Sequence, residues 1–389
     1  MGYPVRILCI VPLLVATLLS GCTTQAPPPA APSPTAVQQQ APAKKEVSSP
    51  AASEQKPTPP PAKPTPAPAK PTPSPTKEPL VKLQSGYAGL DAAPLPLWVA
   101  KEAGLFEKNG LDVDLLFVES GTRIAQAILG GEIPIGNTGG SSTVAATVAG
   151  GDMVIVMGLA NAFPYKVMVA PTIKSPEQLK GKKLGISRFG SSSDVALRFA
   201  LKSMKLDPDK DVSIIQIGGD SQRTAALQSG AIDGTVLNPP GTTIVRRAGF
   251  NELLDMAKLD NAPYQHGTIS TTRSYIAKSP DVVRKYVRSV VEAIQYQRTH
   301  KEEAKRILAK YTKLDDAEGL EEAFVQHNGP GAKSLMPVPY PTKEGLALVI
   351  EEVAAQTPAA KSFTPDKFVD ERFVKELEDS GFIKKLYGQ

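Results

Sequence analysis

The chain has 389 residues, enough for two or three domains, and a net charge of +5. Arg6 contributes +1 and residues 23–79 contribute +3, so about +1 remains for residues 80–389. A nearly neutral body argues against a nucleic-acid partner, which needs clustered basic residues. Cys9 and Cys22 are the only cysteines, and no two of the three histidines lie at metal-ligand spacing. We therefore expect no disulfide, no thiol nucleophile, no metal and no cofactor in the body.

The first 21 residues have the pattern of an export signal. Arg6 precedes an apolar run from Ile7 to Leu19, which is too short to span a membrane as a helix. Small residues then precede Cys22, and this pattern resembles the lipobox of bacterial lipoproteins. We predict a signal peptide over residues 1–21, lipidation of Cys22, and a membrane-anchored lipoprotein facing the periplasm or the cell exterior. The alternative is an ordinary signal peptide in which the cysteine is incidental.

Residues 22–79 are predicted to be a disordered tether. Pro, Ala, Thr, Ser, Gln and Lys make up almost all of this segment, and 18 of the 37 prolines lie within residues 23–79. Without apolar periodicity, the segment has nothing to bury that would offset the entropy of ordering. Its proline density favours extended polyproline II, so the segment would hold the folded body away from the membrane.

From residue 80 to about residue 250, strands and helices alternate. The expected strands are 81–83, 111–118, 133–136, 153–159, 166–170, 183–187, 212–217 and 234–237. The expected helices between and after them are 96–103, 122–129, 141–148, 175–179, 194–204, 221–228 and 241–248. Such alternation predicts an α/β fold with mostly parallel sheets flanked by helices.

After Tyr264 the pattern becomes helical. Residues 281–300 carry one apolar stripe at helical spacing, and further helices are expected at 302–311, 343–353 and 370–377. We expect two lobes, 80–163 plus 265–389 and 164–264, with the helical tail packed on one of them. The two hinge crossings would lie near Asn161–Tyr165 and Asp260–Gly267. His266 would be a structural histidine near the second crossing, and His300 and His327 would be surface residues.

Two loops repeat one arrangement, a strand followed by a Gly/Ser loop and a helix. The first runs from Ile135 to Ser142, and the second from Ile186 to Asp194. Open α/β sheets bind ligands at strand carboxyl ends, and the following helix offers unpaired N–H groups. Neither loop fits a P-loop or a dinucleotide-binding motif, and each is also compatible with an ordinary turn.

A stretch near the start of the body resembles a known family. Residues 96–113, PLWVAKEAGLFEKNGLDV, are similar to the opening of solute-binding proteins for nitrate, sulfonate, taurine and thiamine-pyrimidine importers. The turns at 130–133 and 230–234 and the segment 179–185 match the family's recurring turns and its entry to the second lobe. The resemblance covers about residues 83–300. It implies a two-lobed type II periplasmic-binding-protein fold, hinged twice, that delivers a solute to an ABC importer.

The expected ligand-binding residues are those at strand ends and in the two Gly/Ser loops. Arg188 would offer a fork of donors to an anionic ligand unless it pairs only with Asp194, and Asp91 would favour a ligand that also carries an amine or ring N–H. The full set is Tyr87, Asp91, Ala92, Asn137, Thr138, Arg188, Ser191, Ser192 and Asn238.

Taken together, these features predict the extracytoplasmic solute-binding component of an ABC importer. It would capture a small anionic or zwitterionic organic solute, because helix N-termini from both lobes would face the cleft. Its partners would be the solute, the permease with its ATPase, and the membrane through the lipid anchor, and the chain would act as a monomer. The alternatives are a lipoprotein ligand sensor and an enzyme on the same fold. The cysteine-rich motif of the family's pyrimidine synthases is absent from residues 23–389.

Overall fold

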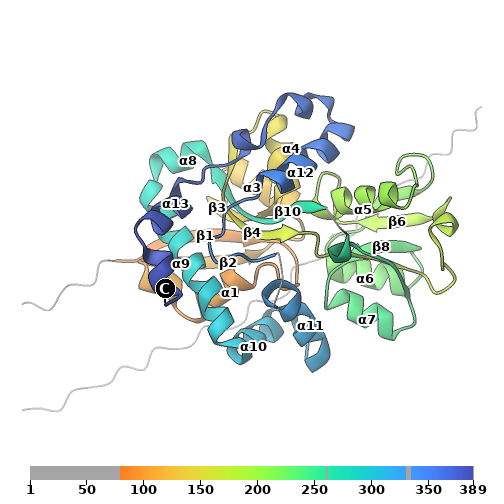
Figure 1. Ribbon diagram of the computed structural model, residues 1–389, viewed down its shortest axis with the longest axis horizontal. Coiled ribbons are helices and arrows are strands. Elements are labelled where there is room, and N and C mark those ends of the chain that lie inside the picture. The colour runs from red at the N-terminus through yellow and green to blue at the C-terminus, as the bar shows by residue number, and fades with distance from the viewer. Residues whose placement is uncertain (1–78, 260–261, 330–333, 389) are drawn as a thin grey trace, which may run out of the picture. The chain divides into compact units, whose positions relative to one another are not determined.

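The computed structural model describes residues 79–259, 262–329 and 334–388. The predicted signal peptide, Cys22 and the tether up to residue 78 therefore lie outside the described residues. The body contains two five-stranded sheets, which we call sheet A and sheet B, each flanked by helices (Figure 1). No helix in the described ranges is both long enough and apolar enough to cross a membrane.

Sheet A has the strand order β2-β1-β3-β10-β4. Its strands are β1 (Val81–Tyr87), β2 (Leu111–Phe117), β3 (Ile135–Gly139), β4 (Met153–Ala162) and β10 (Pro263–Thr272). Strand β1 runs parallel to β2 and β3, whereas β10 runs antiparallel to β3 and β4. The connecting helices are α1 (Leu95–Glu102), α2 (Leu105–Lys108), α3 (Gly121–Leu129) and α4 (Gly140–Val148).

Sheet B has the strand order β7-β6-β8-β5-β9. As in sheet A, the first three strands in this order come from consecutive strand–helix units, with the earliest strand in the middle position. Its strands are β5 (Lys166–Val169), β6 (Lys183–Ile186), β7 (Ser213–Gln216), β8 (Gly234–Leu237) and β9 (Asn251–Asp255). Strand β6 is parallel to β7 and β8, and β5 is antiparallel to β8 and β9. The helical segments here are η1 (Pro176–Leu179), α5 (Ser192–Ser203), α6 (Asp220–Gln228), α7 (Gly241–Arg247) and η2 (Met256–Lys258).

All the strands and helices expected before residue 250 are present, with ends shifted by a few residues. Both sheets are mixed, because one strand in each, β10 in sheet A and β5 in sheet B, runs antiparallel to both of its neighbours. The long strand β10 replaces the purely helical pattern expected after Tyr264. Its sequence, PYQHGTISTT, shows no apolar alternation, yet every residue after Pro263 is buried. Hydroxyl groups satisfy one another inside the sheet: Thr138 Oγ1 lies 2.9 Å from Thr268 Oγ1 and 2.8 Å from Ser270 Oγ.

The helical tail packs mainly on the half that carries sheet A, and α12 also reaches α5 beside sheet B. Helix α9 buries Val283, Tyr286, Val287 and Val290 in the core that contains Trp98 of α1. Helix α12 instead places its apolar residues in the core beside α5. The tail consists of α8 (Arg273–Lys278), α9 (Pro280–Thr299), α10 (Lys301–Thr312), α11 (Ala317–Asn328), α12 (Lys343–Gln356), η3 (Pro358–Ser362), η4 (Pro365–Phe368), α13 (Arg372–Asp379) and α14 (Phe382–Leu386).

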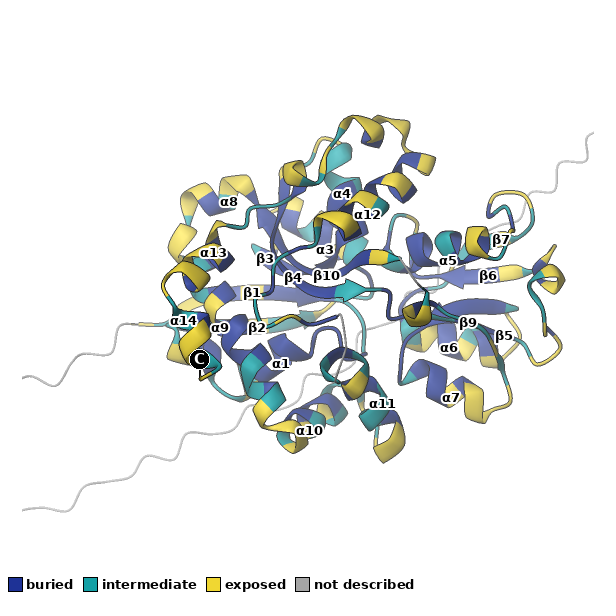
Figure 2. Ribbon diagram, viewed as in Figure 1, coloured by how far each residue is buried: buried dark blue, intermediate teal, exposed yellow. Residues whose placement is uncertain are grey.

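One tail histidine differs from expectation. His327 is buried, and its Nδ1 lies 2.7 Å from the Ser334 hydroxyl, whereas a surface position was predicted. The position of His300 is exposed as expected. Figure 2 shows the general pattern, with buried strands in both sheets and exposed outer faces on the helices.

The chain crosses between the sheets twice. It leaves β4 at Ala162 and enters β5 at Lys166, and it returns from η2 to β10. Phe163 in the first crossing stacks on Tyr264 at the start of β10, with ring centroids 3.9 Å apart. The crossings therefore lie side by side. Residues 260–261 of the second predicted crossing lie outside the described residues.

Candidate functional site

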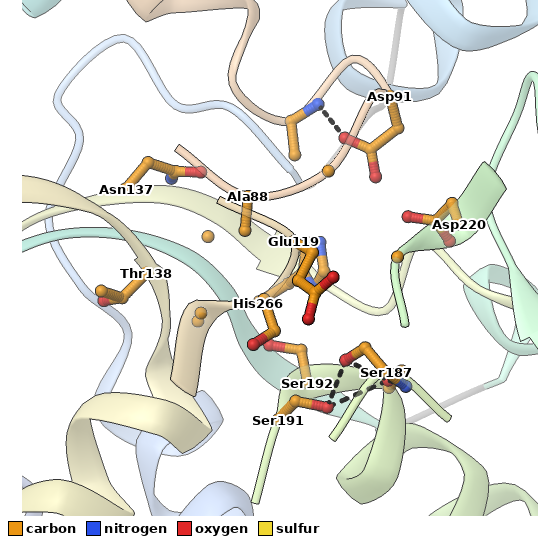
Figure 3. A pocket seen from close by; sticks show the side chains of 18 of the residues that line it. Ala88, Asp91, Glu119, Asn137, Thr138, Ser187, Ser191, Ser192, Asp220 and His266 are labelled. Atoms are coloured by element: carbon orange, nitrogen blue, oxygen red, sulfur yellow. Dashed lines mark hydrogen bonds between the residues drawn. The ribbon is translucent and has the colours of Figure 1, made fainter. Parts of the chain in front are cut away.

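Strand carboxyl ends from both sheets face one cavity of about 60 Å³ (Figure 3). Sheet A contributes the segments that follow β1 and β2 and the end of β3, and sheet B contributes the segments that follow β6 and β7. Strand β10 adds two residues beside the crossings. The lining consists of Ala88, Gly89, Asp91, Ala93, Glu119, Ser120, Gly121, Asn137, Thr138, Gly139, Tyr165, Ser187, Ser191, Ser192, Ser193, Gly219, Asp220, Arg223, His266 and Gly267.

Four helices begin at this cavity, two from each side. The residues preceding α3, α4, α5 and α6 are Ser120, Gly139, Ser191 and Gly219, and all four line it. Each helix begins with N–H groups that have no partner within the helix, and with partial positive charge. The arrangement favours a negatively charged group in the cavity. Sequence analysis identified the starts of α4 and α5, and the structure adds those of α3 and α6.

Three serine hydroxyls form a cluster where α5 begins. Ser187 Oγ donates to Ser191 Oγ at 2.8 Å, and Ser193 Oγ lies 3.0 Å from each of them. The backbone N–H of Ser187 also donates to Ser193 Oγ at 2.9 Å. These bonds fix the loop after β6, and Figure 3 shows Ser187 and Ser191 at one wall of the cavity.

Two carboxylates line the cavity from opposite sheets, the buried Asp91 and the partly buried Asp220. Asp91 Oδ1 accepts from the Ala93 N–H at 2.9 Å, and Asp91 Oδ2 accepts from Asn238 Nδ2. Burial raises the pKa of Asp91. Burial also raises the pKa of Asp220 to about 6, although the neighbouring Arg223 guanidinium opposes this shift. A cationic group between these carboxylates would stabilise their ionised forms.

Arg223 is the cation that lines the cavity. Its Nη1 donates to the Gly218 carbonyl at 2.7 Å, and its Nη2 pairs with Asp220. The side chain is only 2% exposed, and its Nε has no hydrogen-bond partner among the described residues. Arg223 therefore places a guanidinium held by two hydrogen-bonded partners at the cavity wall.

His266, which was predicted to be a structural histidine, also lines the cavity. Burial lowers its pKa to about 3, with a smaller contribution from His327, so the ring is neutral at pH 7. Tyr165 packs edge-on against the ring at 5.1 Å. Within the described part of the chain, His266 Nδ1 has no hydrogen-bond partner. A neutral imidazole can offer one donor and one acceptor to a ligand.

Five of the nine predicted ligand-binding residues line the cavity: Asp91, Asn137, Thr138, Ser191 and Ser192. Asn137 and Thr138 also tie β3 to β10, because Asn137 Nδ2 donates to the Thr268 carbonyl at 3.2 Å. Ligand contact by these five residues stays a prediction.

The other four predicted residues lie outside the lining. Tyr87 packs edge-on against Trp98, with ring centroids 5.5 Å apart, and Ala92 is buried in the adjoining core. Asn238 lies behind Asp91 and binds its carboxylate. Arg188 donates from Nη2 to Glu119 Oε1 at 2.7 Å, which links the two sides at the edge of the cavity. Asp194, the alternative partner expected for Arg188, pairs with Arg198 at 2.8 Å.

The lining residues missed by sequence analysis follow the same local pattern as those it found. Glu119-Ser120-Gly121 after β2 and Gly218-Gly219-Asp220 after β7 are also loops of small or polar residues between a strand and a helix. Arg223 lies one turn into the second of these helices. No three His, Cys, Asp or Glu side chains in the described ranges come together as a metal-binding group.

Known proteins share this sequence and architecture. The family model described as NMT1/THI5 like matches residues 93–304. A Brucella abortus protein described only as a binding protein is 30% identical over 223 residues, which cover 56% of this chain and 68% of that protein. The taurine-binding periplasmic protein of Escherichia coli is 29% identical over 204 residues, covering 51% of this chain and 62% of that protein.

A solved structure shows the same fold. The periplasmic aliphatic sulphonate binding protein SsuA of Escherichia coli superimposes with a TM-score of 0.59 at 22% identity, over 75% of this chain and 92% of that chain. Two mixed sheets with helix N-termini around a shared cavity define an α/β protein of the periplasmic-binding-protein fold. Because the family model covers more than half of its residues, the chain belongs to the NMT1/THI5-like family.

Proposed function

We propose that this protein is the extracytoplasmic solute-binding component of an ABC importer. It captures a small organic solute between its two lobes and delivers it to a permease driven by an ATPase. The observation that carries the proposal is the convergence of four helix N-termini, two from each sheet, on one cavity. Two relatives are named for binding taurine and aliphatic sulfonates, and both names support a small organic solute.

The charges around the cavity support an anionic or zwitterionic solute. The helix N-termini, the serine cluster and Arg223 present donors to an anionic group. Of the two carboxylates, only Asp220 pairs with Arg223, and an amine or ring N–H on the solute would neutralise the excess negative charge near Asp91. A solute that carries an anionic group and an amine or ring N–H would therefore find partners for both groups in the cavity.

Binding would require the lobes to move. A cavity of about 60 Å³ has room for only a few water molecules. We assign the lobes to 80–163 plus 265–389 and to 164–264, a division supported by the membership of the two sheets. The adjacent crossings at Phe163 and Tyr264 would serve as the hinge.

We further propose that the protein is exported and anchored as a monomer. Cleavage before Cys22 and lipidation of its thiol would hold the body outside the cytoplasmic membrane, with residues 22–79 as the tether. A lipoprotein sensor remains the alternative, because a sensor and an importer component need the same capture site. An enzyme on this fold is the second alternative.

A thermal-shift screen tests the proposed function. The probes are taurine, ethanesulfonate, nitrate, a hydroxymethylpyrimidine and benzoate. A ligand that binds only the folded state raises its stability by about 2.7 kcal/mol at 100 times Kd, so a hit raises Tm, and Tm rises further with the logarithm of the ligand concentration. We expect a hit among the sulfonates or the zwitterion, without chemical change of the probe. Turnover of the hit would favour the enzyme, and no shift with any probe would contradict the proposed solute class.

A further inference from the structure

Helix α11 touches both proposed lobes. On one face, Ala323 and Phe324 are buried in the core that contains α9. Glu321 accepts from Lys301 Nζ at 2.6 Å and from Lys305 Nζ at 3.0 Å, both on α10. These contacts fix α11 to the lobe that carries sheet A.

The opposite face of α11 contacts the other lobe. Glu318, Glu322 and Gln326 follow one another at intervals of four residues, so they share one side of the helix. Gln326 Nε2 donates to the Pro164 carbonyl in the first crossing at 2.5 Å. Arg247 of α7 pairs with Glu318 at 2.5 Å and with Asp316, just before α11, at 3.0 Å.

Glu322 is the centre of this contact. Its carboxylate accepts from Thr243 Oγ1 at 2.6 Å, from Arg246 Nη2 at 2.7 Å and from Lys166 Nζ at 3.3 Å. All three donors belong to residues 164–264. The Glu322 side chain is 25% exposed and that of Lys166 is 14% exposed, so these charges are partly shielded from solvent. Such pairs contribute more than fully exposed ones.

When the contact opens, two of its cations keep carboxylate partners in their own lobe. Lys166 has a second carboxylate, Glu252, at 3.5 Å, and a third, Asp255, at 3.7 Å. Arg246 lies 3.9 Å from Glu252. When Glu322 withdraws, both cations keep partners within their own lobe. Breaking a buried pair is costly because one charge is left alone, and this cost is reduced here for Lys166, the most buried of the charges in the contact.

We propose that α11 is an electrostatic latch that holds the two lobes together independently of the solute cavity. The inference rests on the proposed lobes but not on the identity of the solute. Glu322 supplies the attraction across the interface, and α10 anchors the helix from behind. The latch would set the balance of open and closed forms before any solute binds, and salt would weaken it.

Distance measurements on the full-length protein test the latch. In a Cys9→Ser, Cys22→Ser background, spin labels at Lys174→Cys and Lys278→Cys report the separation between the lobes at exposed positions. No solute is added. In 20 mM salt we expect Glu322→Gln to raise the ratio of open to closed forms about fivefold, as loss of a partly exposed ion-pair cluster predicts. Wild type should approach the variant in 500 mM salt.

Glu321→Gln is the matched control. It removes the same charge from the neighbouring residue of the same helix, but its two ion pairs lie within one lobe. Arg246→Gln, from the other side of the contact, should shift the distances in the same direction as Glu322→Gln. The inference is overturned if Glu322→Gln and Arg246→Gln leave the wild-type distances unchanged, or if Glu321→Gln shifts them equally. The solute screen tests the proposed function separately.

Discussion

At the scale of single residues, the two arginines near the cavity, Arg188 and Arg223, have different surroundings. Arg188 is half-exposed and is occupied by Glu119, whereas Arg223 is buried, lines the cavity and keeps Nε unused. Asp91 and Asp220 approach from opposite sheets. We therefore propose that Arg223, rather than Arg188, contacts the anionic group of the solute.

Replacing the two arginines separates their roles. We expect Arg223→Ala to weaken binding of the anionic solute about tenfold or more, because a hydrogen bond to a charged group contributes about 1.5–3 kcal/mol. Arg188→Ala should change the affinity much less, since its side chain lies outside the cavity lining. Calorimetry measures both, with circular dichroism confirming that each variant is folded. A larger loss in Arg188→Ala than in Arg223→Ala would contradict the assignment.

Asp220 should make stability depend on pH. Its pKa is raised by burial from 3.8 to about 6, so between these values the folded chain holds a proton that the unfolded chain has released. Stability from this group is therefore complete at low pH and decreases as pH rises through about 6. The free energy of unfolding of Asp220→Asn minus that of wild type should therefore increase by about 1–3 kcal/mol as pH rises from 4 to 7. Urea unfolding at several pH values measures this, and a constant difference would show that Asp220 titrates normally.

At the scale of elements, the start of α4 meets the start of α5 across the two lobes. A Cβ built on Gly139 would lie 2.0 Å from Ser192 Oγ, although the backbone of Gly139 suits any residue. The close approach of the two lobes therefore requires glycine at position 139. Ser141 Oγ lies 3.5 Å from Ser192 Oγ, which shows how close the two helix starts are.

A larger residue at Gly139 should obstruct closure without unfolding either lobe. We expect Gly139→Val to weaken solute binding about tenfold or more, because the closed form would need to move Ser192 and its helix. The melting temperature should fall only modestly, since the side chain points across the cleft. Binding is measured by calorimetry and folding by thermal melting. Wild-type affinity in Gly139→Val would show that the solute binds without this close approach.

The elements that sequence analysis predicted are those with apolar periodicity. The stripe on α9 and the apolar run of β4 identify both segments directly. Strand β10 was missed because Gln265, Thr268 and Ser270 are buried through hydrogen bonds rather than through apolar side chains. The loops that end in α4 and α5 identified half of the helix N-termini. Arg223 could not be assigned, since its place depends on how α6 packs beside β8.

At the scale of the whole molecule, the two lobes meet at several places besides the cavity. Helix α12 packs beside α5, and Lys202 Nζ pairs with Glu352 at 2.8 Å across this contact. Arg188 and Glu119 meet at the cavity edge, and α11 meets α7. These contacts, together with the adjacent crossings, define a closed form whose opening must separate several charged pairs.

The proposed lipid anchor can be tested by removing the thiol of Cys22. We expect Cys22→Ser to move the protein from the membrane fraction to the soluble fraction, because the thiol would be the only attachment site for lipid. Fractionation and immunoblotting measure the distribution, and a tenfold increase of soluble protein is a reasonable threshold for the loss of one anchor. Membrane-bound Cys22→Ser protein with its signal uncleaved would instead indicate that residues 1–21 hold it there.

We expect the helix N-termini and Arg223 to make the cavity selective for a negatively charged solute. Calorimetry on wild type should compare the strongest anionic hit of the screen with its uncharged amide, which has nearly the same shape. We expect the anion to bind at least about tenfold more tightly, because a tenfold difference corresponds to about 1.4 kcal/mol and a hydrogen bond to a charged group contributes about 1.5–3 kcal/mol. Equal affinity for the anion and the amide would contradict this expectation.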